Sequence, residues 1–258
     1  MPPQFADPLF LAVAVPAVLL AGVSKGGFGA GAGLAATPLL VLAVPPEVAV
    51  GMMLPLLMVM DVTGLRAWWG RWSWVDARAM MAGAVPGIGL GAVFFAVTPT
   101  DAVRLLIGLI ALGFVGWQVA GARGWLVRPA ERPPSNRSAA AWGAVSGFTS
   151  FASHAGGPPA AVHLLGRGLS AGAFQATTVI LFWWINLVKL GPYWAVGLFS
   201  GDQLALAAWL SPLAVVGLLL GVWLHRRVSQ AAFYAVIRVM LVITGAKLTW
   251  DGAVGLLG

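Results

Sequence analysis

GVSKGGFGAG, residues 22–31, and GFTSFASHAGGPP, residues 147–159, are glycine-rich breaks in two otherwise apolar stretches of the chain. In hydrocarbon an exposed peptide group finds no hydrogen-bond partner, so a broken helix is tolerated only where it faces protein or a water-filled cavity. Corresponding broken segments in the two halves of a membrane protein point to the binding site of a transporter. The two breaks therefore predict both the architecture and the functional region.

Composition assigns the chain to the lipid bilayer. Its 258 residues are 60% apolar and 9% charged, and the mean hydropathy is +0.90. That charge cannot cover a soluble surface, so we predict an integral membrane protein. The absence of cysteine excludes disulfides and thiolate metal sites, and we expect no metal and no cofactor. The net charge of +7 does not indicate a nucleic-acid partner, because the arginines lie in short connectors typical of cytoplasmic membrane loops.

The apolar stretches fall into two similar sets. They run near 8–24, 30–44, 48–65, 79–97 and 102–121, and again near 139–153, 155–166, 171–198, 203–224 and 228–250. We predict an all-α polytopic membrane protein with a first repeat at 1–121, a cytoplasmic linker at 122–138 and a second repeat at 139–258. Each repeat contains a Gly-broken helix pair, either crossing or re-entrant, followed by three transmembrane helices. Between six and ten crossings are compatible with this pattern.

The two repeats are predicted to be inverted. At one constant offset, Gly22, Gly31 and Asp61 correspond to Gly147, Gly156 and Asn186. The arginine-rich connector 66–78 and the linker mark the cytoplasmic side of the first half. In the second half, Arg226 and Arg227 lie on the connector that corresponds to the opposite side. Inverted repeats place a transport site at their interface near the midplane, and here they place both termini in the periplasm.

Small residues four apart predict close helix packing. Gly87 and Gly91 in the first half correspond to Gly217 and Gly221 in the second. Such spacing lets transmembrane helices approach closely, so we assign these glycines to packing and not to substrate contact.

The breaks themselves are predicted to bind an anion. A broken helix puts a helix N-terminus inside the membrane, where free amides and the positive dipole end attract negative charge. Ionisable residues inside a membrane mark function, although Lys25 could also snorkel and a neutral His154 could bond to Ser153. The candidate anion-binding residues are Lys25, Gly26, Gly27, Gly29, Gly31, Ser153, His154, Gly156, Gly157 and Asn186.

Asp61 and Asn186 are expected to face the same interior space, because they are equivalent in the repeat. An ionised Asp61 would repel an anion, so we expect it to pair with Arg66 or to be protonated. Asp61 and His154 are the candidates for proton coupling, since imidazole titrates near neutral pH. Lys189, one helical turn after Asn186, adds positive field. Further polar side chains that could line this span are Gln175, Thr177 and Thr178.

The two breaks resemble those of the TauE/SafE sulfite exporter family, in the pairing of GVSKGGFG at 22–29 with TSFASHAGGPP at 149–159. The likeness extends over nearly the whole chain. It implies a multi-pass transporter of the bacterial inner membrane whose substrate is a small sulfur-containing anion such as sulfite or a sulfonate. Export by alternating access is the expected mechanism, because the membrane potential expels anions. A homodimer is one expected assembly.

Two other function classes remain open from the sequence. One is a membrane scaffold or assembly protein without a substrate, for which the charges in the breaks are dispensable. The other is an intramembrane serine protease, because residues 22–26 fit G-x-S-x-G and His154 could act as the base. The repeat disfavours the protease, since Ser24 corresponds to Thr149 and a nucleophile has no reason to be duplicated. We therefore expect no enzymatic activity.

Overall fold

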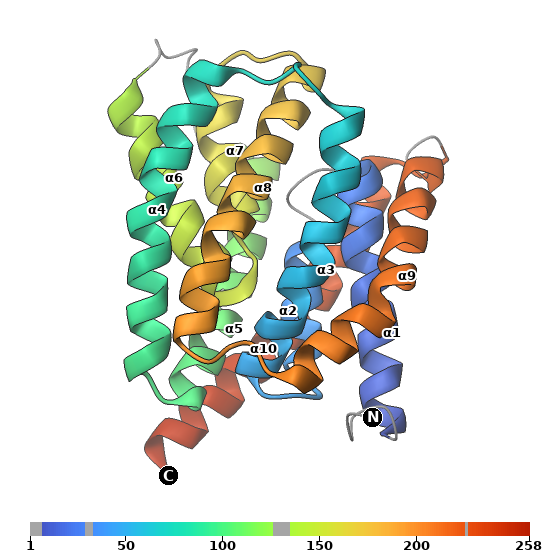
Figure 1. Cartoon of the computed structure of the whole chain (residues 1–258), viewed down its shortest axis with the longest axis vertical. Helices are drawn as coiled ribbons and strands as arrows, with labels where there is room; N and C mark the ends of the chain where they lie inside the picture. Colours follow the sequence, from blue (N-terminus) through green and yellow to red (C-terminus); the bar gives the residue numbers. More distant parts are fainter. Residues whose placement is uncertain (1–6, 29–32, 126–134, 225–226) are drawn as a thin grey trace.

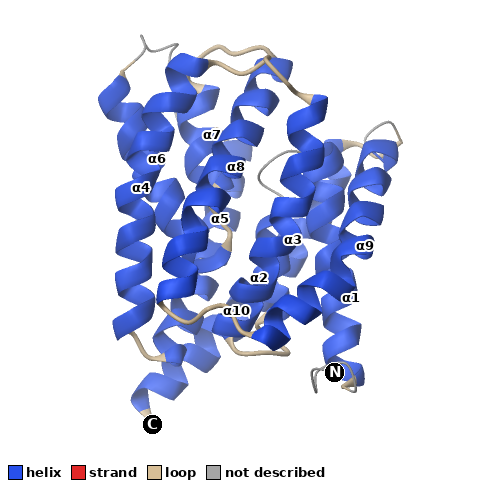
Figure 2. Ribbon diagram, viewed as in Figure 1, coloured by secondary structure: helices blue, strands red, loops and turns tan. Residues whose placement is uncertain are grey.

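The computed structural model describes residues 7–28, 33–125, 135–224 and 227–258, which are helical and contain no strand (Figure 2). Within them, seven helices are long and apolar enough to cross a membrane. They are α1 with the turn that extends it (Pro8–Phe28), α3 (Pro46–Ala67), α4 (Trp74–Val97), α5 (Thr100–Ala122), α8 (Ala171–Ala195), α9 (Gly201–Leu224) and α10 (Gln230–Leu257). The predicted all-α polytopic membrane protein is confirmed.

The helices run between two ends of one bundle (Figure 1). At one end, Ser73 before α4 donates its amide to the Thr177 hydroxyl near the start of α8, over 2.9 Å. We call it the linker end, because α5 ends and α6 begins there. At the other, terminal end, the Thr100 hydroxyl at the start of α5 donates to Glu47 in the first turn of α3, over 2.8 Å. Helix α1 begins and α10 ends at the terminal end.

The first break joins α1 to the short helix α2. Helix α1 (Pro8–Val23) passes into a π-helical turn at Ser24–Phe28. A 3₁₀ turn at Gly33–Ala35 leads into α2 (Ala36–Leu40). Since α1 and α3 both begin at the terminal end, α1 and α2 form a hairpin that enters and leaves there.

The second break forms a re-entrant hairpin from the linker end. Helix α6 (Asn136–Ser153) starts inside the predicted linker and runs parallel to α4. Helix α7 (Gly157–Leu165) then returns, because Arg167 just beyond it donates to Asp76 in the first turn of α4 over 2.7 Å. Helices α3, α4, α5, α8, α9 and α10 run from one end of the bundle to the other (Figure 1).

Glycines set the closest helix contacts, and these join the two halves. A Cβ atom added at Gly87 of α4 would lie 2.0 Å from the Ala144 carbonyl oxygen of α6. One added at Gly221 of α9 would lie 2.3 Å from the Val23 carbonyl oxygen of α1. The predicted packing role of these glycines is confirmed. The first helix of each half therefore packs on the fourth helix of the other half, which supports the inverted repeats. Their inversion stays a prediction.

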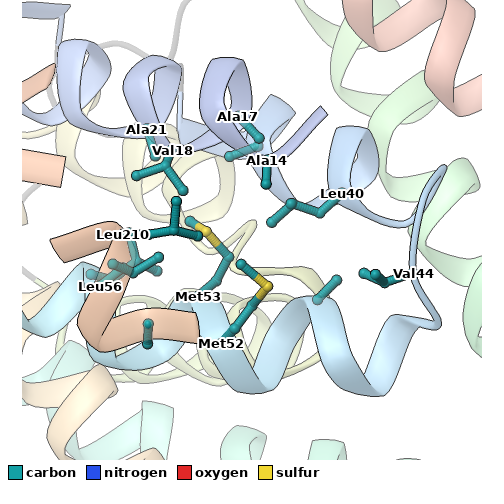
Figure 3. Close-up of a cluster of buried hydrophobic side chains, with 14 of the residues drawn as sticks. Ala14, Ala17, Val18, Ala21, Leu40, Val44, Met52, Met53, Leu56 and Leu210 are labelled. Carbon is teal, nitrogen blue, oxygen red and sulfur yellow. The ribbon is translucent and has the colours of Figure 1, made fainter. Parts of the chain in front are cut away.

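A buried apolar cluster anchors the first hairpin (Figure 3). Small side chains of α1, such as Ala14 and Ala17, let Met52 and Met53 of α3 and Leu210 of α9 pack closely around it. The bundle exterior is apolar as well, as at the exposed Leu90 and Val93 of α4. A surface of this kind is stable against lipid tails, which the membrane assignment requires.

Candidate functional site

A cavity of about 1260 Å³ opens at the linker end and reaches into the bundle as far as the first break. The π-helical turn of α1 contributes Lys25, and the other walls come from α3, α5, α7, α8, α9 and α10. Aromatic rings form much of its wall, among them Phe114, Trp117 and Phe174.

The charges that line this cavity are all positive. Lys25 lies at its inner limit, Arg71 on the exposed connector between α3 and α4, and Arg238 within α10. The described residues of the wall include no Asp or Glu. Among the described residues, no carboxylate forms an ion pair with Arg71 or Arg238. Low-dielectric walls of one charge sign raise the local concentration of ions of the opposite sign, so the cavity attracts anions.

Lys25 forms an ion pair with Asp61 and donates to the Leu57 carbonyl oxygen over 3.3 Å. Its side chain is 22% exposed, whereas that of Asp61 is only 4% exposed. The pairing of Asp61 with Arg66 that we expected is therefore wrong. Arg66 lies five positions further along α3, on a different face, and is exposed.

Asp61 also receives a hydrogen bond from the side-chain amide of Asn186, over 2.6 Å. This contact joins α3 to α8 in the middle of the bundle, as the equivalence of the two residues in the repeat predicts. A recess of about 40 Å³ beside it is lined by Gln175 and Thr178 and adjoins the cavity at Lys25. Thr177 is instead bonded to Ser73 and lies near the linker end.

His154 ends α6 in a left-handed conformation, with a φ of 55°. Glycine is the usual residue at such a position, and another side chain there costs roughly 1 kcal/mol. Its Nε2 lies 3.0 Å from the Val50 carbonyl oxygen of α3. Because a carbonyl only accepts, Nε2 carries the hydrogen. The alternative bond from His154 to Ser153 does not form, since the Ser153 hydroxyl donates to the Thr149 carbonyl oxygen over 3.3 Å.

Lys189 contacts the other side of the His154 ring. Its Nζ lies 2.9 Å from Nδ1 of His154, and 3.1 Å from both the carbonyl oxygen and the hydroxyl of Ser150. The side chain is fully buried, and the ring of Tyr193 lies over it with 5.5 Å from Nζ to the ring centre. With the ring hydrogen on Nε2, Nδ1 of the neutral imidazole accepts from the Lys189 amino group.

These side chains form a band across the bundle that we call the polar layer. Its members are Lys25, Asp61, Ser150, His154, Asn186 and Lys189. On its terminal side, the buried rings of Phe151 and Tyr193 meet edge to face, and the Tyr193 hydroxyl donates to the Phe151 carbonyl oxygen over 2.8 Å. The cavity and these rings thus flank the polar layer on opposite sides.

The backbone of the second break offers few donors to an anion. Pro158 and Pro159 follow Gly157 at the start of α7 and carry no amide hydrogen. The amides of His154 and Ala155 donate to the carbonyl oxygens of Ser150 and Thr149. Side chains add positive charge here, and the anion site of backbone amides, which include those of Gly156 and Gly157, stays a prediction.

The candidate glycines fall into three groups. Gly27 lines the cavity. Gly26 lines it too, but an added Cβ would lie 2.1 Å from the Leu218 carbonyl oxygen, so close packing also requires glycine there. Gly156 and Gly157 are buried within the second hairpin, and Gly156 accepts a hydrogen bond from the Ser146 hydroxyl. Gly29 and Gly31 lie outside the described residues.

The geometry around His154 does not resemble a serine protease site. Both ring nitrogens are engaged, one with Val50 and one with Lys189. A general base needs a nitrogen within hydrogen-bond reach of the nucleophile, and here neither is directed to the buried Ser24.

Sequence reasoning missed two cationic residues of the cavity. Arg238 lies inside the apolar stretch 228–250, and an arginine within a span was a sufficient signal to include it. Arg71 was counted only as a marker of the cytoplasmic side. Lys189 was recognised as a source of positive field, but its contacts with the second break were not foreseen.

Comparison with known proteins gives one family. The family described as "Sulfite exporter TauE/SafE" matches residues 14–248. No curated protein and no solved structure matches the chain.

Proposed function

From the premise that this chain belongs to the sulfite exporter TauE/SafE family, we propose that it exports a small sulfur-containing anion, such as sulfite or a sulfonate, by alternating access. The family is one of membrane transporters, and the seven long apolar helices support a multi-pass membrane protein. The proposed location is the bacterial inner membrane, with the linker in the cytoplasm and both termini in the periplasm. A homodimer is the assembly that we would test first, by crosslinking in membranes.

The observation that carries this proposal is the charge of the cavity. Lys25, Arg71 and Arg238 line it, and the described wall residues contribute no carboxylate. Arginine and lysine are the side chains that bind oxyanions best, through charge and through several donors each. The arrangement supports entry of an anion from the linker end and its binding at Lys25.

The proposed direction follows from the membrane potential. An anion that leaves a cytoplasm held negative gains about 2.3 kcal/mol per charge for every ~100 mV. The cavity opens at the linker end, which the arginine pattern predicts to be cytoplasmic. In this conformation the transporter is therefore ready to load an anion from the cytoplasm, and no coupling ion is required for export.

Alternating access needs a barrier that changes sides. The rings of Phe151 and Tyr193 close the terminal side of the polar layer here. We propose that the two hairpins move relative to α3 and α8, so that these rings separate while the cavity at the linker end closes. If protons are coupled to this step, Asp61 and His154 are the proposed carriers, because both lie in the polar layer.

The proposal is tested by transport into inside-out membrane vesicles. Vesicles that contain the wild-type chain should accumulate radiolabelled sulfite or a radiolabelled sulfonate, driven by an inside-positive potential. Lys25→Met should abolish this uptake. Lys247→Met is the matched control, because Lys247 is exposed and paired with Asp251 away from the cavity. Equal uptake by vesicles with and without the protein would contradict the proposal and favour the substrate-free scaffold.

A further inference from the structure

The polar layer holds more basic groups than acidic ones. Lys25 and Lys189 contribute two amino groups, and Asp61 is the layer's carboxylate. His154 is neutral, because Nε2 donates to Val50 and Nδ1 accepts from Lys189. With both lysines protonated, the layer carries one excess positive charge inside the bundle.

Lys189 is the cation that lacks a counter-charge. It is 0% exposed, and its contacts are Ser150, His154 and the ring of Tyr193. Among the described residues, no carboxylate forms an ion pair with it. A buried amino group keeps its proton only when an opposite charge compensates it and otherwise becomes neutral, so an additional anion would complete the layer with Lys189 protonated.

Asp61 lies where it can serve either lysine. One carboxylate oxygen contacts Lys25, and the other accepts from Asn186. Lys189 is three positions after Asn186 on α8, and residues three apart lie on the same face of a helix. Lys25 thus contacts the carboxylate from the cavity, and Lys189 lies one helical turn along α8 from the amide that bonds its other oxygen.

We propose that the substrate is a monoanion that replaces Asp61 on Lys25, and that Lys189 then takes over the released carboxylate. This inference rests on the proposed function and adds the charge of the substrate and a role for Lys189. Two lysines, one aspartate and one monoanion make two ion pairs and leave no net charge. A dianion would leave the layer negative, so the site discriminates by charge before it discriminates by shape.

The exchange also connects substrate binding to the second break. When Lys189 turns to Asp61, its hydrogen bonds to Ser150 and to Nδ1 of His154 are lost. These bonds hold the end of α6 against α8. Binding at the first break therefore loosens the second hairpin, beside the rings that close the terminal side.

Binding to the purified full-length protein in detergent tests the proposal, with methanesulfonate as the probe because it stays a monoanion at all working pH values. The wild type should bind methanesulfonate more tightly than sulfate. Lys189→Met keeps the length and volume of the side chain but leaves the released carboxylate without a cation. It should weaken methanesulfonate binding more than about tenfold, although Lys189 does not line the cavity.

A double variant separates charge balance from a structural role. Asp61→Asn removes the competing carboxylate and should strengthen methanesulfonate binding by about tenfold or more. Asp61→Asn combined with Lys189→Met leaves Lys25 as the layer's lysine, so binding should return to within about threefold of the wild type. A purely structural loss caused by Lys189→Met would not be rescued by Asp61→Asn.

Three results would each overturn the proposed exchange. They are unchanged methanesulfonate binding in Lys189→Met, no recovery of binding in the double variant, and tighter binding of sulfate than of methanesulfonate. Those results leave the proposed function intact as long as the wild type still transports sulfite or a sulfonate. If the folded wild type neither binds nor transports any of these anions, the proposed function itself is contradicted.

Discussion

The two breaks occupy equivalent positions in the repeat, but they hold their charges in opposite ways. In the first, the broken segment supplies the cation, and Lys25 reaches the Asp61 carboxylate of α3. In the second, the central helix supplies the cation, and Lys189 of α8 reaches Ser150 and His154 at the broken segment. In both halves an ammonium group ties a hairpin to a central helix.

The repeat therefore preserves a contact between each hairpin and a central helix, although the residue that makes this contact differs between the halves. The first link faces the cavity and contains a carboxylate that an incoming anion can replace. The second link lies outside the cavity wall and uses neutral acceptors, so an anion from the linker end does not reach it directly. We infer that the first break binds the incoming substrate and that the second break changes its contacts in response.

The largest expected difference between the breaks is in transport. Lys25→Met should lower uptake of radiolabelled sulfite into inside-out vesicles more than about 100-fold, since a buried carboxylate left without its cation costs about 3–5 kcal/mol and the anion loses its ligand. Lys247→Met should stay within about twofold of the wild type. Uptake by Lys25→Met at the level of the control would show that the first break does not load the substrate.

The second comparison concerns packing at the two breaks. Gly26→Ala in the first break would place Cβ 2.1 Å from the Leu218 carbonyl oxygen, and Gly156→Ala in the second would place it 2.7 Å from that of Ser146. Both should lower the free energy of unfolding, by about 3 kcal/mol for Gly26→Ala and about 1 kcal/mol for Gly156→Ala.

Gly89→Ala is the control for this pair, because nothing lies within 4 Å of an added Cβ there. Thermal unfolding of the purified variants in detergent ranks their stabilities. A Gly26→Ala variant as stable as Gly89→Ala would contradict the tight contact between the first break and α9.

Most of the fold was predictable because membrane helices are determined by composition and length. The apolar stretches give the order of the long helices, and the repeat offset brings Asp61 and Asn186 together. The return of the second hairpin to the linker end was not predictable, because the length of 139–153 suits a crossing as well as a re-entrant helix. That choice depends on tertiary contacts, such as Arg167 with Asp76.

The candidate site was predictable only in part. Lys25 and His154 stand out as ionisable residues in broken apolar segments, and both belong to the polar layer. Their partners depend on which faces of distant helices meet, which no local pattern contains. The predicted site of backbone amides stays a prediction, and the sequence limits it to the residues before Pro158 and Pro159, which have no amide hydrogens.

A third comparison tests the left-handed residue His154, which ends α6 in the second break. His154 has a φ of 55°, where glycine is unstrained and alanine is not. His154→Gly and His154→Ala both lose the bonds to Val50 and Lys189, so their difference isolates the backbone. We expect His154→Gly to be more stable than His154→Ala by about 1 kcal/mol in chemical or thermal unfolding. Equal stability would mean that the backbone relaxes when the side chain is removed.

The smallest expected effect concerns the approach of the anion to the first break. Arg71 is exposed at the cavity wall, where its charge acts on the anion through solvent. Arg71→Gln should raise the KM for sulfite about threefold at low ionic strength and leave the maximal rate unchanged, because it alters attraction and not the bound state. The effect should vanish in roughly 0.5 M salt, since screening then acts over a few ångströms. Arg78→Gln is the matched control, because Arg78 is exposed near the same end but does not line the cavity. A change in KM that persists at high salt would instead make Arg71 a direct ligand of the anion, and would move part of the binding site from the first break to the cavity entrance.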